Sequence, residues 1–200
     1  MAYSKWEQKL SAFKSWRKKD VSESQRLTWN YLKDSFLEMV SELPIGKNWL
    51  CLDVGCGSGC YLSEIVQQHN CRGIGLDPLK GSSLEAFKNR ISACKKLSEV
   101  GLIQSIGEHL PVTDNSINLC IMTGALDHVA NPEQTFKEIH RILAPEGYFL
   151  LLQSVVKKLN VHHDDETHVN EFTVASLKAL FKNFKILKLT EATAFRLPCL

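Results

Sequence analysis

From residue 49 onward the chain alternates short apolar runs with longer stretches of helical periodicity. The short runs have the length and composition of buried strands, and the stretches between them place apolar residues three or four positions apart, as a helix requires. The predicted strands are residues 49–54, 72–76, 101–106, 117–122, 148–153 and 185–190, and the predicted helices are residues 61–69, 83–97, 131–143 and 174–181. Strands that alternate with helices form βαβ units, so the pattern predicts an α/β fold with a doubly wound, mostly parallel sheet covered on both faces.

Two further helices are predicted ahead of this alternating region. In residues 2–19, aromatic and aliphatic side chains recur at helical spacing, and residues 22–43 begin with a capping-box pattern and continue with one apolar face. The first of these helices either packs on the main domain through its apolar stripe, covers a ligand site as a lid, or contacts an acidic surface. We therefore expect an N-terminal helical lid or appendage over residues 1–46 and the main domain over residues 47–200.

Charge and hydropathy narrow the class of protein. The net charge of +2 gives no overall field that favours nucleic acid or a membrane surface, although residues 1–20 hold six basic and only two acidic side chains. The longest apolar run, residues 148–152, is far shorter than the roughly 18 residues of a membrane-spanning helix, and the first ten residues are polar and charged, unlike a secretory signal. We expect a cytoplasmic chain that crosses no membrane and keeps its seven cysteines reduced.

A glycine-rich turn follows the first predicted strand of the sheet. The run Asp53–Gly59 carries glycine at positions 55, 57 and 59, and a predicted helix begins directly after it. Glycine permits a tight turn and close approach of a ligand, and the free N–H groups of a helix start favour a carboxylate or phosphate. Asp77 ends the next strand, where a carboxylate can accept hydrogen bonds from both ribose hydroxyls of a nucleoside. An acid at position 53 suits a cationic cofactor better than a pyrophosphate.

The residues around this turn resemble motif I of the class I S-adenosylmethionine-dependent methyltransferases, since Leu52–Gly59 reads Leu-Asp-Val-Gly-Cys-Gly-Ser-Gly. Residues 107–122, 125–129 and 136–150 are similar to the later motifs of the small-molecule, or type 11, branch of that family. The resemblance extends over about residues 48–190. It implies the Rossmann-like fold of that family, S-adenosylmethionine as cofactor, S-adenosylhomocysteine as product, and a small-molecule acceptor.

The resemblance also implies which residues form the cofactor site. The glycines would border the methionine half of the cofactor, with Asp53 near its amino group. Asp77 would bind the ribose, Leu79 would lie close to the adenine, residues 108–109 would stand at the adenine edge, and Thr123 would lie beside the sulfonium. The complete expected set is Asp53, Gly55, Cys56, Gly57, Gly59, Asp77, Pro78, Leu79, Gly107, Glu108, His109 and Thr123.

Several positions depart from the family pattern. Ile106 stands where an acid is common, so recognition of the adenine would fall to the next two residues. Residues 117–118 read Ile-Asn in place of Phe-Asp, and residues 145–147 read Pro-Glu-Gly in place of Pro-Gly-Gly. Only ten residues follow the sixth predicted strand, so we expect a shortened or missing final strand. The far edge of the sheet and the choice between monomer and homodimer stay open.

No single catalytic residue follows from the family pattern. His128 is a candidate base, with packing or capping as the alternative, because histidine does both. Residues 161–168 hold three histidines and three acids, among which His163 and His168 are further candidates. A pocket-lining loop, a catalytic base and a metal site are all compatible with this cluster. Since no His-x-x-x-His spacing is present, we predict no metal.

Three functions remain to be weighed. The first is a methyltransferase acting on oxygen, nitrogen or carbon of an unidentified small molecule, held by residues 123–131 and 154–172 together with the N-terminal helices. The second is a methyltransferase-like module that binds the cofactor without turnover. The third is a transfer- or ribosomal-RNA methyltransferase, which would use the basic N-terminal helix and show strongly salt-dependent binding. The small basic charge and the lack of an added RNA-binding domain argue against nucleic acid as the partner.

Overall fold

The computed structural model describes residues 23–57, 59–78, 85, 100–156 and 169–190. Within them, five strands form one sheet in the order β3-β2-β1-β4-β5, and every neighbouring pair is parallel. The strands are β1 (Leu50–Val54), β2 (Arg72–Leu76), β3 (Val100–Ile103), β4 (Ile117–Thr123) and β5 (Leu143–Leu152). The predicted doubly wound α/β fold is therefore confirmed. The chain runs outward from β1 to β3 and then crosses to β4, so the strand order reverses between β1 and β4.

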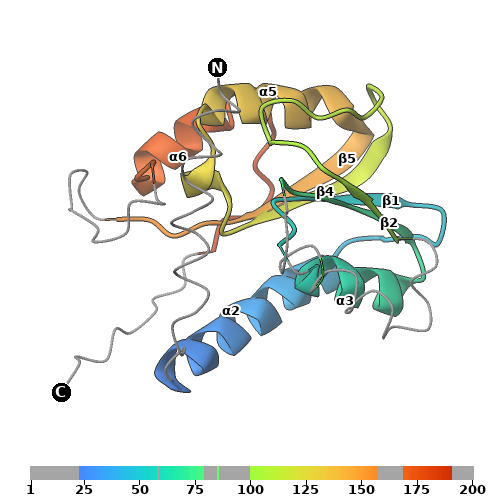
Figure 1. Cartoon of the computed structure of the whole chain (residues 1–200), viewed down its shortest axis with the longest axis horizontal. Coiled ribbons are helices and arrows are strands. Elements are labelled where there is room, and N and C mark those ends of the chain that lie inside the picture. Colours follow the sequence, from blue (N-terminus) through green and yellow to red (C-terminus); the bar gives the residue numbers. More distant parts are fainter. Residues whose placement is uncertain (1–22, 58, 79–84, 86–99, 157–168, 191–200) are drawn as a thin grey trace.

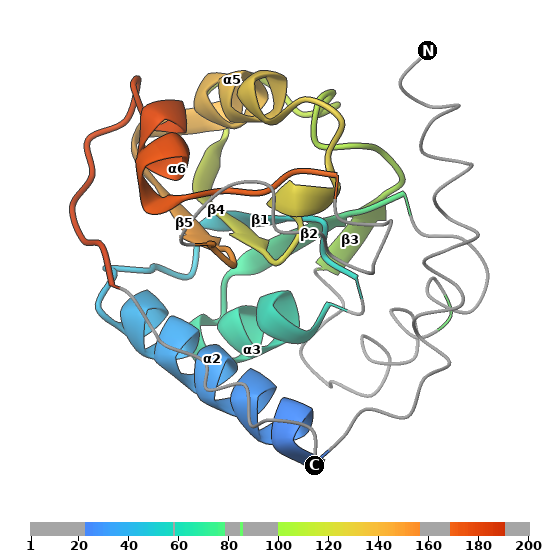
Figure 2. The same ribbon diagram turned by 90° about the vertical axis from the view of Figure 1, so that its left-hand side faces the viewer.

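Helices cover both faces of this sheet (Figures 1 and 2). The helices α2 (Glu23–Ser41) and α3 (Cys60–His69) lie on one face, and α5 (Pro132–Ile142) and α6 (Val174–Leu180) lie on the other. A single turn of 3-10 helix, η2 (Leu126–His128), follows β4 at the carboxyl edge. Two apolar cores result, one between the sheet and each layer. Within the described ranges, no helix is both long enough and apolar enough to span a bilayer.

The alternation of side chains along β1 divides its residues between the two cores. Leu52 and Val54 face the α5 and α6 layer, whereas Cys51 faces α2 and α3. All three are at most 1% exposed, since β1 is the central strand and is covered on both sides. This is why the strand reads as a nearly continuous apolar run. Asp53 is the exception, and it lies on the same face as Cys51.

The aromatic residues of the α5 and α6 layer form the densest part of its core. Phe136 on α5 makes edge-to-face contacts with Phe149 of β5, Phe181 and Phe184, at ring-centroid distances of 5.4, 4.9 and 5.9 Å. Edge-to-face pairs contribute about 0.5–1.5 kcal/mol each beyond their burial. The cluster joins α5 and α6 to β5, the last strand of the sheet. It therefore fixes the position of α5, whose first turn adjoins the carboxyl edge.

Helix α5 begins as its sequence predicts. The Asn131 side chain accepts a hydrogen bond from the Gln134 amide at 3.0 Å, and Pro132 occupies the first helical position. The helix ends at Ile142, because Leu143 already pairs with Ile117 in the sheet. Strand β5 therefore starts five residues earlier than the predicted strand at 148–153, with a register irregularity in its first half.

Residues 185–190 do not form the predicted sixth strand. They follow α6 and pass along the β5 side of the sheet towards α2 (Figure 2). The Lys188 ammonium contacts the Glu42 carboxylate at 2.6 Å. Ile186, Leu187 and Leu189 are 47–67% exposed. Apolar composition alone does not make a strand, because a strand also needs a neighbour for its backbone hydrogen bonds. Among the described residues, β5 has only β4 as a paired neighbour.

Strand β3 differs from its predicted bounds. The predicted strand at 101–106 is shorter in the structure, because Ile106 pairs instead with His109 in a turn. The predicted helix at 2–19 lies outside the described residues, and so does the one at 83–97 apart from residue 85, which is helical. The division at residue 46 stays a prediction, although Phe36 of α2 is buried against the main domain and makes an edge contact with Tyr61 at 5.2 Å.

Candidate functional site

The glycine turn after β1 is shaped by three left-handed residues. Gly55, Gly57 and Gly59 have φ values of 75°, 52° and 70°, which side chains rarely permit. A Cβ at Gly55 would also overlap the Ala125 methyl group, so the turn packs directly on the segment after β4. The amides of Gly55 and Cys56 both donate to the Leu76 carbonyl, at 2.7 and 3.2 Å. The turn is thus fixed against the ends of both β2 and β4.

Asp77 joins three parts of the carboxyl edge. Its carboxylate accepts a hydrogen bond from the Gly57 amide at 2.8 Å, and its own amide donates to the Ile103 carbonyl at 3.2 Å. The side chain is half-buried and the following Pro78 is buried. A carboxylate can accept several hydrogen bonds at once, of which the bond from Gly57 is one. Leu79 lies outside the described residues.

Asp53 is a buried carboxyl beneath the glycine turn. It is 1% exposed, and neither carboxyl oxygen has a hydrogen-bond partner among the described residues. Burial, and to a smaller extent the charge of Asp77, raise the pKa of Asp53 to about 8. Burial and the Asp53 charge likewise raise the pKa of the Cys56 thiol. A buried carboxyl without a partner is costly, so this position favours a cationic group brought in by a ligand.

The segment between β3 and β4 places Gly107 and Glu108 against the start of α5. Glu108 Oε1 accepts hydrogen bonds from the amides of Ala130 and Asn131, at 2.6 and 3.0 Å. The Asn131 amide belongs to the N-cap of α5 and the Ala130 amide directly precedes it, and the start of a helix attracts a carboxylate. Glu108 Oε2 is buried with no partner among the described residues. The sequence suggested Glu108 only as a ligand contact, whereas the structure gives one of its oxygens a structural role.

The other residues of this segment differ in exposure. Gly107 is buried, and a Cβ there would lie 3.0 Å from the Thr135 methyl carbon. His109 is exposed, and its amide donates to the Ile106 carbonyl at 3.1 Å. Of these predicted residues, only Gly107 and Glu108 are therefore held tightly against α5.

The turn after β4 forms the other side of the carboxyl edge. Thr123 is half-buried at the end of the strand. The Asp127 carbonyl accepts hydrogen bonds from the amides of Val169 and Asn170, at 2.8 and 3.1 Å. His128 Nε2 lies 3.9 Å from Asp127 Oδ1. The segment that begins at residue 169 is therefore hydrogen-bonded to the same turn as His128. His163 and His168 lie outside the described residues.

Sequence reasoning missed two features near this edge. Gln153 directly follows β5, and its Oε1 is buried without a partner among the described residues. Glu138 and Arg141 of α5 form an ion pair at 2.7 Å that also bonds the β3–β4 segment. A Glu-x-x-Arg spacing on one helix is a weak signal for such a pair. No pattern along the sequence marks Gln153.

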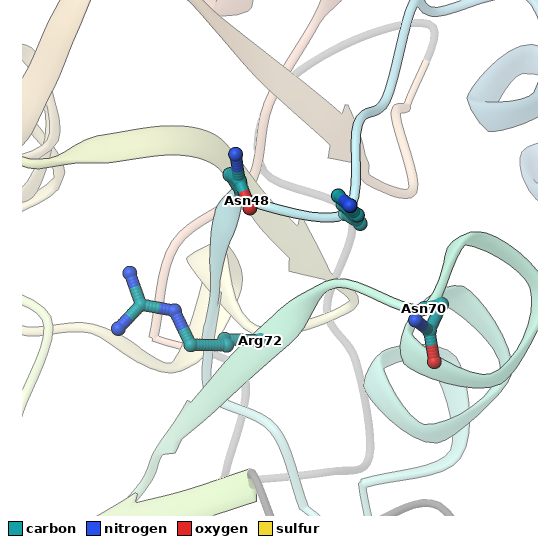
Figure 3. Close-up of a pocket in the computed structure, with 4 residues that line it drawn as sticks. Asn48, Asn70 and Arg72 are labelled. Atoms are coloured by element: carbon teal, nitrogen blue, oxygen red, sulfur yellow. The ribbon is translucent and has the colours of Figure 1, made fainter.

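A hollow of about 490 Å³ lies at the opposite end of the sheet, at the amino ends of β1 and β2. Lys47, Asn48, Asn70 and Arg72 line it, and the Arg72 side chain extends away from Asn70 rather than towards it (Figure 3). Parallel sheets bind ligands at their carboxyl ends, so this hollow is separate from the candidate site. Within the described part of the chain, no three His, Cys, Asp or Glu side chains gather in an arrangement that could hold a metal.

Comparison with known proteins finds a family match over the central half of the chain. The family model described as "Methyltransferase domain" matches residues 52–151, which include the glycine turn, Asp77, the β3–β4 segment and β4. Demethylmenaquinone methyltransferase from Lactobacillus johnsonii is 28% identical over 181 residues, with 74% of each chain covered. Malonyl-[acyl-carrier protein] O-methyltransferase from Hamiltonella defensa is 32% identical over 142 residues. That match covers 68% of this chain and only 51% of the relative.

Solved structures show the same fold. The YcgJ protein from Bacillus subtilis superposes with a TM-score of 0.66 at 23% identity, covering 75% of this chain and 67% of the other. A geranyl diphosphate methyltransferase in complex with S-adenosylmethionine gives a TM-score of 0.65 at 16% identity, with 76% of this chain and 63% of the other covered. Together with the family match, these results show that the chain belongs to the class I family of S-adenosylmethionine-dependent methyltransferases.

Proposed function

We propose that this chain transfers the methyl group of S-adenosylmethionine to a small-molecule acceptor at the carboxyl edge of its sheet. The carrying observation is the arrangement around Asp77, whose carboxylate bonds the left-handed glycine turn at the point where the strand order reverses. The relatives named for demethylmenaquinone and for malonyl-[acyl-carrier protein] support an acceptor outside the nucleic acids.

The chain's own residues fit the two ends of this cofactor. We propose that Asp77 accepts hydrogen bonds from the ribose hydroxyls while it keeps the Gly57 amide as a donor. S-Adenosylmethionine carries an ammonium and a sulfonium, and Asp53 is a buried carboxyl at the same turn with no hydrogen-bond partner in the described part of the chain. A positive charge nearby would favour the ionised form of Asp53 and remove the penalty of its burial. The glycines, Cys56 and Pro78 complete the backbone wall of this half.

The adenine end is proposed to lie along the β3–β4 segment. Ile103 ends β3 beside Asp77, and the chain then passes through Gly107, Glu108 and His109. Glu108 Oε2 is buried and without a partner among the described residues, so it could accept from a base edge without giving up its bonds to α5. Leu79, which lies outside the described residues, stays a proposed contact from sequence.

The acceptor side is proposed to be the turn after β4. When bound, the cofactor supplies a methyl group on a sulfonium, which is ready for in-line displacement. The protein must orient the acceptor and exclude water. Thr123 and His128 come from this turn, and Val169 and Asn170 are hydrogen-bonded to it. His128 is our candidate to remove a proton from a hydroxyl or amine acceptor, with the Asp127 carboxylate 3.9 Å away. His163 and His168 stay further candidates.

The test is a calorimetric titration of the purified chain with S-adenosylhomocysteine and S-adenosylmethionine. Asp77→Ala removes the charge-assisted bonds to the ribose, each worth about 1.5–3 kcal/mol, so affinity should fall at least tenfold. Asp34→Ala, at an exposed position on α2, is the matched control and should bind as the wild type does. A folded wild-type chain that binds neither ligand would refute the proposal. Binding without turnover of any acceptor would instead favour a non-catalytic module.

A further inference from the structure

The β3–β4 segment is held to α5 by side chains that bond its backbone. Glu138 Oε2 accepts a hydrogen bond from the Leu110 amide at 2.9 Å, and Arg141 Nη2 donates to the Leu110 carbonyl at 2.7 Å. Arg141 Nη1 donates to the Val112 carbonyl at 2.9 Å. Two side chains on one helix thus bond both backbone polar groups of Leu110, whose carbonyl also accepts a hydrogen bond from the Val112 amide at 2.7 Å. The Leu110 side chain is 1% exposed in the core below.

The two side chains also hold each other in place. Arg141 Nε donates to Glu138 Oε1 at 2.9 Å, and Arg141 Nη2 lies 2.7 Å from Glu138 Oε2. This is a two-point guanidinium–carboxylate pair, which fixes geometry as well as charge. The Arg141 guanidinium also contacts Asp114 at 2.5 Å. The hydrogen bond to Arg141 lowers the pKa of the Glu138 carboxyl, so it stays ionised at neutral pH.

A second attachment lies at the other end of the same helix. Glu108 Oε1 bonds the amides of Ala130 and Asn131, just before α5 begins. The segment from Glu108 to Val112 is therefore tied to both ends of a helix that is itself packed by Phe136 in the aromatic cluster. Neither Glu138 nor Arg141 is among the residues we place in contact with the cofactor.

We infer that Glu138 and Arg141 are positioning residues, which hold Gly107 and Glu108 where the adenine end of the cofactor is read. The inference rests on the proposed function, because it takes the β3–β4 segment as the adenine wall. Without the pair, the backbone of Leu110 and Val112 loses three hydrogen bonds, and the residues before them keep the Glu108 attachment but lose their support on the Leu110 side. Small displacements of a recognition group reduce binding even when the group itself is unchanged.

The test compares S-adenosylhomocysteine with S-inosylhomocysteine, which lacks the exocyclic amine of adenine. Calorimetry measures both ligands on the wild type, Arg141→Met, Glu138→Gln and Arg141→Lys. Ile139→Val is the matched control, because Ile139 lies between the two residues on α5 but is buried in the core. It should lower the thermal midpoint without changing the ratio of the two affinities. Hydrogen–deuterium exchange of peptides covering residues 105–112, without ligand, reports the protection of the Leu110 amide, which donates to Glu138, and the order of the amides around it.

We expect Arg141→Met to weaken S-adenosylhomocysteine binding about fivefold or more and to reduce the preference over S-inosylhomocysteine, with Arg141→Lys between it and the wild type. Faster exchange over residues 105–112 should accompany the loss. An unchanged affinity ratio in Arg141→Met, or a wild type that does not distinguish the two ligands, overturns the inference and leaves the proposed function standing. A folded wild type that binds neither ligand overturns the proposed function, and this inference with it.

Discussion

Replacing Asp53 with Asn should stabilise the ligand-free chain relative to the wild type, and this difference should grow as pH rises. The same substitution should weaken binding of the cofactor. Asp53 is 1% exposed and has no hydrogen-bond partner among the described residues. Burial raises its pKa from 3.8 to about 8, so the folded chain keeps a proton that the unfolded chain loses near pH 4. Asparagine has a similar shape and does not titrate in this range.

The size of the effect follows from linkage between protonation and folding. A carboxyl with a raised pKa supports folding fully below its unfolded pKa, and this support is lost as pH rises towards the folded pKa. Each pH unit between about 4 and 8 therefore lowers the free energy of unfolding of the wild type by about 1.4 kcal/mol. At pH 7 this amounts to about 4 kcal/mol, an order-of-magnitude figure that Asp53→Asn should recover apart from a pH-independent offset for its own buried amide.

Urea unfolding of both proteins at pH 5, 6, 7 and 8, followed by circular dichroism, measures the difference. The free-energy gap between Asp53→Asn and the wild type should widen steadily with pH. Calorimetry with S-adenosylhomocysteine should show weaker binding by the variant at the same pH values. If the free energies of unfolding of the two proteins changed with pH in the same way, Asp53 would not be protonated in the folded chain at neutral pH. The argument that this position favours a cationic ligand group would then fail.

Two further substitutions test the turn and the core. Gly55→Ala combines a left-handed φ with overlap on Ala125, so we expect it to lose about 1–3 kcal/mol of stability together with cofactor binding, whereas Gly101→Ala has open space and should change neither. Phe136→Ala removes the centre of the aromatic cluster and should lower the free energy of unfolding by about 3–5 kcal/mol in urea titrations. A loss below 1 kcal/mol would show that this cluster is not a structural centre.

The central part of the fold was predictable because each strand there is buried on both faces. Leu52 and Ile121 belong to opposite cores, and both lie in runs that are apolar without alternation. The segment 185–190 has the composition of a strand, yet its place depends on whether a neighbour offers backbone groups. Periodicity along the chain carries no information about that neighbour, and the prediction there was wrong.

The sequence predicted those residues of the candidate site that belong to short motifs, but it did not predict the contacts between residues far apart in the chain. The glycines and Asp77 belong to short patterns whose chemistry follows from residue type and position. Glu108 instead bonds amides 22 and 23 residues further along the chain, and Arg141 bonds carbonyls 29 and 31 residues before it. Such pairings exist only once α5 lies along the β3–β4 segment, so no local pattern could have shown them.

The central position of β1 has a consequence for how the chain folds during synthesis. Leu52 pairs with Ile74 of β2 on one side and with Cys120 of β4 on the other. Strand β1 is synthesised first, and its second neighbour, β4, is synthesised much later. At roughly 5–20 residues per second, the ribosome needs about 3–14 s to pass from residue 52 to residue 120. Throughout that interval one edge of an apolar strand lacks its partner. Parallel sheets of this kind nucleate slowly through distant contacts, and the nascent chain is therefore most exposed to aggregation just before β4 is complete.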